Sequence, residues 1–434
     1  MRNVTLLAFV FSIINTCIAQ QENDKYLQIK GDLNTRNIIE AVYNNEQNSL
    51  RKLNAEAYVS YNWYIASAPD QQWQKLPGIK TSRIVLLSEY AGKYLKCEMI
   101  ADFKQSKKQF SAKAITNSAI QEKGNSNTDW FKKAGIGLMI HFLSDVYLKN
   151  ANSAEWNKVV NGFDTEKFAD DCKKAGVGYV LFALGQNSGY YCSPNKAYDS
   201  IVGSKPGELC SKRDLPADLS KSLQSRGIRM MFYLPGNPPI NNKRVTDKFK
   251  YTFKKDSPTS QYTQACWEAV MKEWSVRYGK ALAGWWFDGM YSGGIIETRS
   301  DMSLAHNIST HTLAAKAGNP ESIITYNYGV KKMQSNSPYD DYSAGEKQEL
   351  DEVPEGRWVA PGVQWFFFTY LGKWWSGEGT RYTTDTLVQW SEKVFDKEGV
   401  LCFDVHAYAN GSIDAAQLQQ LQAIKAAFEK SKKK

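Results

Sequence analysis

The chain has 434 residues, of which 42% are hydrophobic and 23% are charged. These ordinary values exclude a disordered, collagen-like or coiled-coil chain, and the length predicts two or three domains. The formal net charge is +9. Because the basic residues are scattered, without an Arg-rich helix or a zinc-finger spacing, no nucleic-acid partner is predicted. Aromatic residues reach 13% of the chain, an excess that fits sugar stacking as well as core packing.

The first 19 residues have the pattern of a secretory signal peptide. Arg2 supplies a positive charge, Leu6 to Ile14 form a short apolar core, and Cys17-Ile18-Ala19 resembles a cleavage site. The apolar run is far shorter than the ~20 residues that cross a bilayer, and no other stretch of the sequence is long and apolar enough, so no membrane span is expected. We therefore expect a soluble secreted or periplasmic protein. Lipidation of Cys17 is the alternative.

The remaining cysteines do not indicate a metal site. They are Cys97, Cys172, Cys192, Cys210, Cys266 and Cys402. None belongs to a CxxC pair or stands at ligand spacing from a histidine. No glycine-rich nucleotide motif follows a predicted strand, so neither a metal nor a cofactor is expected. Cys192 and Cys210 flank one loop. The sequence does not decide between a disulfide and two free thiols at these positions.

Residues 20–122 predict a small all-β sandwich domain. Apolar and polar residues alternate with a period of two in Ala57 to Tyr64 and in Lys93 to Met99, which is typical of strands. The stretch from Tyr61 through Gly78 to Gly92-Lys93-Tyr94-Leu95 resembles the Ig-like repeats of bacterial surface proteins. That resemblance implies a spacing, docking or binding role. The polar residues 123–129 are expected to form a linker.

Residues 130–430 alternate short apolar strands with amphipathic helices. The strand candidates are Gly137 to Phe142, Tyr179 to Leu184, Arg229 to Leu234, Gly284 to Phe287, Ser322 to Asn327, Gln364 to Thr369 and Gly399 to Val405. Helical patterns lie between them, for example Thr165 to Ala175 and Leu215 to Arg226. Repeated βα units over this length predict an α/β fold, a (β/α)8 TIM-like barrel rather than an open doubly wound sheet.

Chemistry in such a barrel belongs at the carboxyl ends of the strands. Polar residues stand at four of these ends: His141, Gln186 with Asn187, Tyr233, and Asp288. Asp288 closes the aromatic run Trp285-Trp286-Phe287 and precedes Gly289, where a ligand can approach the backbone. A carboxylate beside tryptophan suits glycoside hydrolysis, which uses two carboxyl groups. A helix N-cap is the alternative role for Asp288.

Residues 130–428 resemble the α-L-fucosidase family of retaining glycosidases, glycoside hydrolase family 29. The similar segments, in chain order, are Trp130-Phe131-Lys132-Lys133-Ala134, Gly137 to Phe142, Glu155-Trp156, Phe163-Asp164, Lys174 to Leu181, Arg213-Asp214-Leu215, Gly227 to Tyr233, Trp286-Phe287-Asp288-Gly289, Gly399 to Val405 and Asn410 to Ile413. The resemblance implies a barrel, retaining chemistry and Asp288 as the nucleophile. It also implies that His141, Glu155, Gln186, Asn187, Tyr233 and Trp286 bind the substrate.

The sequence departs from the family pattern at several sugar-contacting positions. The family's K-H-H-D-G-F is replaced by Leu184 to Tyr190, so that Gln186 and Asn187 stand where two histidines are usual. The arginine of N-x-R-W-G is absent from Tyr326-Asn327-Tyr328-Gly329, and the glutamate of the usual W-E is replaced in Trp358-Val359. Amides in place of imidazoles and a cation change which hydroxyls the pocket recognises.

The second carboxylate is expected from residues 339–356. Asp341 to Glu346 resembles the family's D-Y/F-x-T-P-E, which makes Glu346 the first candidate for the acid/base. Glu349, Glu352, Glu355 and Glu155 are the alternatives. Trp365, Trp374 and Trp375 are candidates for a platform under the leaving-group sugar, with core packing as the other interpretation.

The sequence therefore predicts an exported retaining exo-glycosidase acting on a terminal α-L-fucoside or a related sugar such as an α-L-galactoside. Its partner is expected to be an oligosaccharide or glycan. The competing hypothesis is a catalytically degenerate glycan-binding protein on a glycosidase scaffold, motivated by the missing arginine and W-E glutamate. An adhesin-like structural protein is a third possibility, but it leaves the barrel motifs unexplained.

Overall fold

The computed structural model describes residues 24–45, 49–106, 108–251, 260–290, 300–329 and 333–431. The predicted leader, residues 1–19, lies outside these ranges. The chain forms two compact units that divide between Lys123 and Gly124. Within the described ranges, no helix combines the length and the apolar character needed to cross a bilayer.

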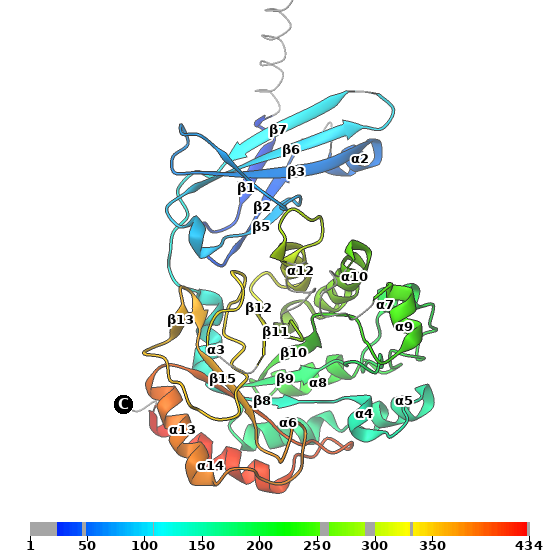
Figure 1. The fold of residues 1–434 in the computed structure, drawn as a ribbon, viewed down its shortest axis with the longest axis vertical. Helices are drawn as coiled ribbons and strands as arrows, with labels where there is room; N and C mark the ends of the chain where they lie inside the picture. The colour runs from blue at the N-terminus through cyan, green and yellow to red at the C-terminus, as the bar shows by residue number, and fades with distance from the viewer. Residues whose placement is uncertain are drawn as a thin grey trace, which may run out of the picture. The chain divides into compact units, whose positions relative to one another are not determined.

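The N-terminal unit contains two antiparallel sheets (Figure 1). The three-stranded sheet has the order β1-β2-β5, with β1 at Leu27–Lys30, β2 at Ile38–Tyr43 and β5 at Arg83–Val85. The four-stranded sheet has the order β4-β3-β6-β7, with β4 at Gln74–Leu76, β3 at Ala57–Ala66, β6 at Tyr94–Phe103 and β7 at Gln109–Ile115. The Tyr43 ring of β2 lies 5.7 Å from the Phe110 ring of β7. Side chains of the two sheets therefore pack together.

The unit also contains an α-helix that the strand pattern did not predict. Helix α2 spans Leu50–Glu56, and the Ser49 side chain accepts a hydrogen bond from the Lys52 backbone at its start. Leu53 is buried. The expectation of an all-β unit was therefore wrong for these seven residues. The helix was not predicted because one buried apolar residue in a short polar segment gives no helical period in the sequence.

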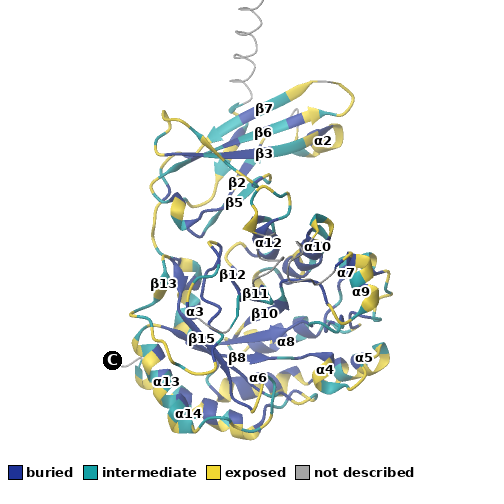
Figure 2. Ribbon diagram, in the orientation of Figure 1, coloured by how far each residue is buried: buried dark blue, intermediate teal, exposed yellow. Residues whose placement is uncertain are grey.

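The second unit is built on a parallel sheet of seven strands in the order β12-β11-β10-β9-β8-β16-β15 (Figure 1). The strands are β8 Ile136–Ile140, β9 Tyr179–Ala183, β10 Arg229–Pro235, β11 Leu282–Asp288, β12 Ile323–Tyr326, β15 Phe366–Tyr370 and β16 Val400–Asp404. Each lies at one of the seven predicted positions. Nearly all of their residues are buried, and the strands are dark blue in Figure 2. Such runs are typical of parallel strands covered on both faces.

Helices alternate with these strands. They are α3 Asp129–Ala134, α4 Ser144–Tyr147, α5 Ser153–Gly162, α6 Thr165–Lys174, α7 Lys196–Val202, α8 Leu215–Gln224, α9 Lys243–Phe249, α10 Gln261–Tyr278, α12 Ile308–Ala315, α13 Thr384–Asp396 and α14 Ala415–Ser431. Asp164 and Asp214 cap the backbone amides that begin α6 and α8. A short antiparallel pair, β13 Trp358–Ala360 with β14 Val363–Gln364, precedes β15.

Residues 341–347 connect the two edge strands of the sheet. On one side the Asp341 amide donates to the Ile324 carbonyl of β12 at 2.8 Å. On the other side the Ser343 amide donates to the Gln364 carbonyl of β14 at 3.0 Å, and the Lys347 amide donates to the Phe368 carbonyl of β15 at 2.9 Å. We call residues 341–347 the closing segment.

Carboxylates replace backbone carbonyls where the closing segment meets β12. The Ile324 amide donates to Asp341 Oδ2 at 2.9 Å, and the Tyr326 amide donates to Asp340 Oδ1 at 3.1 Å. Asp341 Oδ2 also lies 2.7 Å from Lys316 Nζ, and both side chains of this ion pair are at most 2% exposed. Asp341 Oδ1 accepts from Asn125 Nδ2 at 2.8 Å. Buried side chains thus fix this end of the closing segment.

Asn125 and Thr128 belong to the second unit, although the sequence predicts a linker at 123–129. Both side chains are buried, and Ser126–Thr128 form a 3-10 helix that leads into α3. A run of small polar residues is typical of a linker, which is why the sequence predicts one. In the structure the side chains of Asn125 and Thr128 instead form hydrogen bonds with buried polar groups.

All six cysteines in the described residues are free thiols, including Cys192 and Cys210. Five of the six are buried. Of the two alternatives for Cys192 and Cys210, the structure therefore has the free thiols and not the disulfide.

Replacing Lys316 by methionine is expected to destabilise the second unit by about 3–5 kcal/mol, because the buried charge of Asp341 loses its partner. Lys397→Met is the matched control, since its partner Glu355 is 98% exposed and such pairs contribute about 1 kcal/mol or less. Urea unfolding of both variants measures the difference. Equal losses would contradict the structural role assigned to the buried pair.

Candidate active site

A pocket of about 360 Å³ lies at the carboxyl ends of the parallel strands. Its lining residues are His141, Leu143, Asp145, Val146, Gln186, Tyr233, Trp286, Asp288, Glu346, Phe368, Trp374, Trp375 and Ser376. Six of the eight residues predicted from the sequence are among them, namely both carboxylates together with His141, Gln186, Tyr233 and Trp286. Parallel strands bring these residues together because their carboxyl ends meet at one edge of the sheet.

Asp288 is the last residue of β11 and is held by hydrogen bonds from three directions. The Tyr233 hydroxyl donates to Oδ2 at 2.6 Å. Oδ1 accepts from the Gly289 amide at 2.8 Å and from Asn327 Nδ2 at 3.0 Å. Gly289 has a φ of 72°, a conformation that glycine adopts without strain, so the chain turns directly after the carboxylate.

Glu346 lies on the closing segment and faces Asp288 across the amide of Asn327. Asn327 Nδ2 donates one hydrogen bond to Asp288 Oδ1 at 3.0 Å and another to Glu346 Oε2 at 2.5 Å. The two carboxylate oxygens are therefore at most about 5.5 Å apart, the limit set by these two distances in line. This upper limit is compatible with the 5–5.5 Å of retaining glycosidases and lies below the ~6.5–9.5 Å of inverting ones.

The backbone before Glu346 requires a glycine. Gly345 has a φ of 61°, and a Cβ atom there would lie 1.9 Å from the Phe366 carbonyl oxygen. The Gly345 carbonyl in turn accepts a hydrogen bond from the Phe368 amide at 2.9 Å. The close contact between the closing segment and β15 thus fixes the backbone position of Glu346.

Burial and the nearby charge of Asp288 raise the pKa of Glu346 to about 7. The hydrogen bond from Asn327 and the charge of His141 act in the opposite direction on the same pKa. A carboxyl group whose pKa lies near neutrality can both give up and accept a proton in this pH range.

His141 follows β8 and contacts a carboxylate that the sequence analysis did not select. Its Nδ1 lies 2.6 Å from Oδ1 of Asp404, the last residue of β16, and Asp404 is fully buried. The Ser376 amide donates to the other oxygen of Asp404. Burial alone would lower the pKa of His141, but the charge and hydrogen bond of Asp404, with Asp288 and Glu346 nearby, raise it. The pocket thus favours an imidazolium beside its two carboxylates.

Aromatic rings form much of the remaining wall. Tyr233 and Trp286 stack with their centroids 5.5 Å apart and their planes 19° apart, and the Tyr233 hydroxyl accepts a hydrogen bond from the Gln186 amide. Trp374 and Trp375 also line the pocket, and Trp374 is 62% exposed. Trp365 is fully buried and absent from the lining, so its role is packing.

Several predicted site residues lie elsewhere. Glu155 is exposed near the start of α5, where it accepts a hydrogen bond from Asn152, and Asn187 is half-buried outside the pocket lining. The structure therefore does not bring these two residues to the pocket. The alternative acid/base candidates Glu349, Glu352 and Glu355 do not line the pocket either; Glu352 pairs with Lys347 and Glu355 with Lys397.

Neither Asn327 nor Asp404 was predicted as a site residue. Both stand at the ends of predicted strands, Ser322 to Asn327 and Gly399 to Val405, so the strand-end rule that selected Asp288 also applied to them. Their roles were hidden because Asn327 acts by joining two carboxylates and Asp404 by contacting His141. These partners are distant in sequence.

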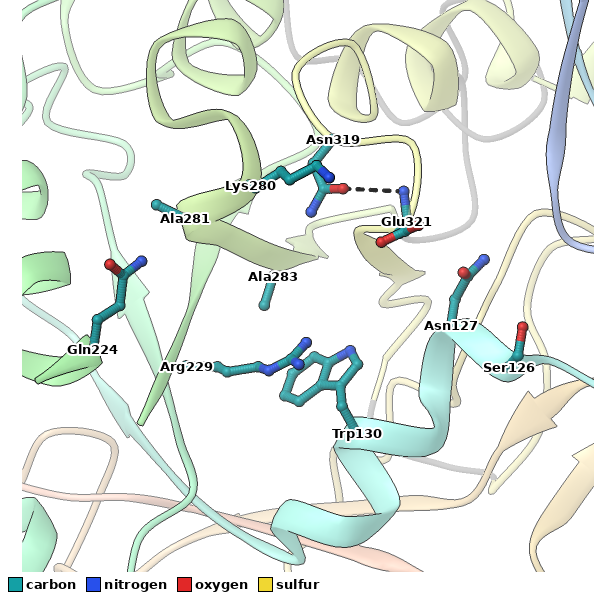
Figure 3. A pocket seen from close by; sticks show the side chains of 10 residues that line it. All are labelled: Ser126, Asn127, Trp130, Gln224, Arg229, Lys280, Ala281, Ala283, Asn319 and Glu321. Atoms are coloured by element: carbon teal, nitrogen blue, oxygen red, sulfur yellow. Dashed lines mark hydrogen bonds between the residues drawn. The ribbon is translucent and has the colours of Figure 1, made fainter. Parts of the chain in front are cut away.

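A second pocket of about 610 Å³ lies at the opposite, amino ends of β10, β11 and β12 (Figure 3). Its Arg229 guanidinium is 4.6 Å from the Trp130 ring centroid. Glu321 is the only carboxylate in its lining, so this pocket cannot supply a carboxylate pair. In the part of the chain that the structure describes, no cluster of three or more His, Cys, Asp or Glu could hold a metal ion.

A carboxylate pair at the strand ends of a parallel α/β sheet is the arrangement that glycoside hydrolysis uses. The sequence profile of the family described as Alpha-L-fucosidase matches residues 159–431, well over half of the chain. The protein belongs to this family. A search of curated protein sequences gives no match.

Solved structures with similar folds include two endo-fucoidan hydrolases of glycoside hydrolase family 107. MfFcnA4 has a TM-score of 0.55 and 16% identity over 70% of this chain and 54% of that chain. MfFcnA9 has a TM-score of 0.53 and 15% identity over 69% of this chain and 63% of that chain. The present chain thus spans less than two thirds of either hydrolase. The alpha-L-fucosidase AlfC, solved with 4-nitrophenyl-α-L-fucopyranoside, has a TM-score of 0.49 and 17% identity over 71% of this chain and all of that chain.

Asn327→Ala is expected to raise the pKa of Glu346, because the variant removes the hydrogen bond that favours the carboxylate. Difference infrared titration of the carboxyl band measures the shift. Asn157→Ala is the control, since Asn157 donates to the Ser153 and Gly207 carbonyls outside the pocket. An unchanged or lowered Glu346 pKa in the Asn327 variant would contradict the bridging role.

Proposed function

We propose that the protein is an exported retaining exo-glycosidase that removes a terminal α-L-fucosyl residue or a closely related sugar such as α-L-galactose. The observation that carries the retaining mechanism is the separation of at most about 5.5 Å between the Asp288 and Glu346 oxygens that share Asn327. That distance leaves no room for a water molecule to attack from the face opposite the leaving group, as an inverting mechanism requires.

In the first step the Asp288 carboxylate attacks the anomeric carbon while the bond to the leaving oxygen breaks. Protonated Glu346 gives its proton to that oxygen, and a glycosyl ester forms on Asp288. Tyr233 and Asn327 hold the attacking carboxylate in a fixed orientation through their hydrogen bonds. Orientation of this kind reduces the entropic cost of the attack.

In the second step Glu346, now ionised, takes a proton from water, and the resulting oxygen nucleophile attacks the anomeric carbon. The ester bond to Asp288 breaks and Glu346 is protonated again. A group that acts as both acid and base works best when its pKa is close to the ambient pH. The pKa of Glu346, about 7, meets this condition.

The substrate class is supported by the family and by the pocket. The family is described as Alpha-L-fucosidase, and the neighbour MfFcnA4 is an endo-fucoidan hydrolase. A volume of about 360 Å³ is at the small end of the range for ligand pockets, which fits one terminal sugar with part of the adjoining group. Gln186 lines the pocket where the family has a histidine, and Asn187, at the second histidine position, lies outside the lining. The preferred hydroxyl pattern is therefore expected to differ from that of fucose itself.

The pairing of the closing segment also supports a full barrel, because Tyr342 and Glu346 form parallel bridges with Gln364 and Phe368. Residues 341–347 lie between β12 and β15 and hydrogen bond to both sides of the gap. We place this segment at the eighth strand position of a (β/α)8 barrel.

A glycan-binding protein without activity is the alternative function, favoured by the missing family arginine. The paired carboxylates and the raised pKa of Glu346 count against it, because binding alone does not require a proton donor beside a nucleophile. Binding of glycosides without turnover of any member of an aryl glycoside panel would favour this alternative.

Asp288→Asn is expected to lower kcat/KM on aryl α-L-fucosides and α-L-galactosides by about 10³-fold or more. A 2-fluoro glycoside is expected to form a covalent adduct at Asp288, visible by mass spectrometry of the peptides. Asp385→Asn, an exposed carboxylate of α13, is the control. Full activity of the Asp288 variant would refute the proposed nucleophile.

The pH dependence of kcat/KM is expected to show a fall as the pH rises through about 7, because the first step needs Glu346 in its protonated form. Glu346→Gln is expected to lose this limb and most activity on substrates with poor leaving groups, whereas exposed Glu349→Gln retains both. A basic limb that persists in the Glu346 variant would assign the titration to another group.

Export is expected to remove residues 1–19. Mass spectrometry of the protein recovered from a secreting host tests this directly, with Gln20 as the expected first residue. A chain that begins at a lipidated Cys17 would show membrane anchoring instead.

A further inference from the structure

The four-stranded sheet of the N-terminal unit has a polar outer face that the proposed hydrolysis does not use. Along β3 the inward residues Trp63 and Ile65 are buried, and along β6 so are Leu95, Cys97 and Met99. The alternate residues belong to the opposite face because side chains on a strand alternate with a period of two. The strand register places Tyr64 beside Lys75 of β4 and Lys96 of β6.

Two aromatic rings and a lysine form a cluster at one end of this face. The Lys96 ammonium lies 4.7 Å from the Tyr64 ring centroid and 4.7 Å from the Trp73 ring centroid. Tyr64, Trp73 and Lys96 are all half-buried, so each also presents surface to solvent. A lysine between two rings is ordered before any ligand arrives, which reduces the entropic cost of binding.

Two further lysines border the cluster. Lys75 is exposed, and exposed Lys80 donates to the Asn62 side chain at 3.2 Å, two residues before Tyr64 on the same face. Lys75, Lys80 and Lys96 form no ion pair with a described residue. Glu98, the next outward residue on β6, accepts from the Tyr64 hydroxyl at 2.9 Å and pairs with Lys113 at 3.5 Å. The positive charge of the three lysines is therefore not balanced within the face.

About half of the net charge of the exported chain belongs to the same unit. Residues 20–123, without the predicted leader, contain 15 Lys and Arg against 11 Asp and Glu, a balance of +4. Residues 124–434 contain 38 against 34, a balance of +4 over a much longer segment. A local excess of this size attracts polyanions over distances of about 10 Å at moderate salt.

We propose that Tyr64, Trp73, Lys75, Lys80 and Lys96 form a binding site for an anionic polysaccharide whose acidic groups are carboxylates or sulfate esters. The rings offer apolar surface to sugar rings, and the lysines offer point charges to the acidic groups that flank them. The site is separate from the catalytic pocket, since all five residues belong to the N-terminal unit.

A polysaccharide fits this face better than a folded protein partner. The face mixes aromatic surface with charge and lacks the large apolar centre of a stable protein interface. On this face lysines lie next to aromatic rings. An acidic polysaccharide has a matching pattern, because the apolar faces of its sugar rings alternate with acidic groups. A nucleic acid shares both features, so the experiment must separate it from an acidic glycan.

Affinity gel electrophoresis of the full chain tests the proposal with dextran sulfate, polygalacturonate, uncharged dextran and an oligo-dT strand as probes. We expect retardation by one or both acidic polysaccharides, weaker binding as salt is added, and little retardation by dextran or oligo-dT. The two acidic probes distinguish sulfate from carboxylate recognition. Retardation by oligo-dT as strong as by the acidic glycans would overturn the proposal, and so would no retardation by either glycan.

Two variants separate this site from general charge attraction. Trp73→Ala is expected to weaken glycan binding about fivefold at constant charge, and the triple replacement Lys75→Gln, Lys80→Gln, Lys96→Gln about tenfold. The matched control replaces Lys158, Lys221 and Lys272, which are exposed on α5, α8 and α10, by glutamine. Equal weakening by the two triple variants, or no effect of Trp73→Ala, would overturn the site.

These variants do not touch the catalytic pocket, so turnover of a small aryl glycoside is expected to stay unchanged. Binding is measured without turnover. Failure of the glycan site would therefore leave the proposed hydrolase untouched, and failure of the hydrolase would leave the binding result interpretable.

Discussion

Two carboxylates placed within about 5.5 Å of each other in a mostly buried pocket repel, and one amide group makes this arrangement stable. Asn327 gives one N–H to Asp288 and the other to Glu346. The two acids then differ in their surroundings. Asp288 also accepts from Tyr233 and Gly289, whereas Glu346 is left with burial and a neighbouring charge. In the proposed mechanism this asymmetry lets one acid attack while the other carries the proton.

The position of Glu346 depends in turn on how the sheet closes. The closing segment has no long strand partner on its β12 side, and the side chains of Asp340 and Asp341 accept from the β12 amides instead. Lys316 and Asn125 complete the surroundings of Asp341. The free-energy cost of burying these charged groups is offset only when every partner is present. The position of Glu346 therefore depends on the hydrogen bonds and the ion pair that Asp341 forms beside β12.

Much of this architecture could be predicted because its signals are local. Apolar runs between amphipathic helices identified seven strands, and the strand-end rule selected Asp288, Tyr233 and His141. The segment that carries Glu346 was less visible, because carboxylates and a single glycine replace the regular strand pattern there. Asn327 and Asp404 escaped notice since each works through a residue distant in sequence, and Glu155 was assigned by motif similarity although its side chain faces solvent. Helix α2 was missed because it has a single apolar anchor.

Asn125 has a consequence for where this chain can be divided. It is the second residue after the boundary between the two units, and its amide reaches Asp341 and the Gly362 carbonyl. A shortened chain that starts at Trp130, where the family-like motifs begin, would therefore lack a group that the closing segment needs, whereas one that starts at Gly124 keeps it. The start of the second unit is thus set by a buried hydrogen bond that lies a few residues before the first motif shared with the family.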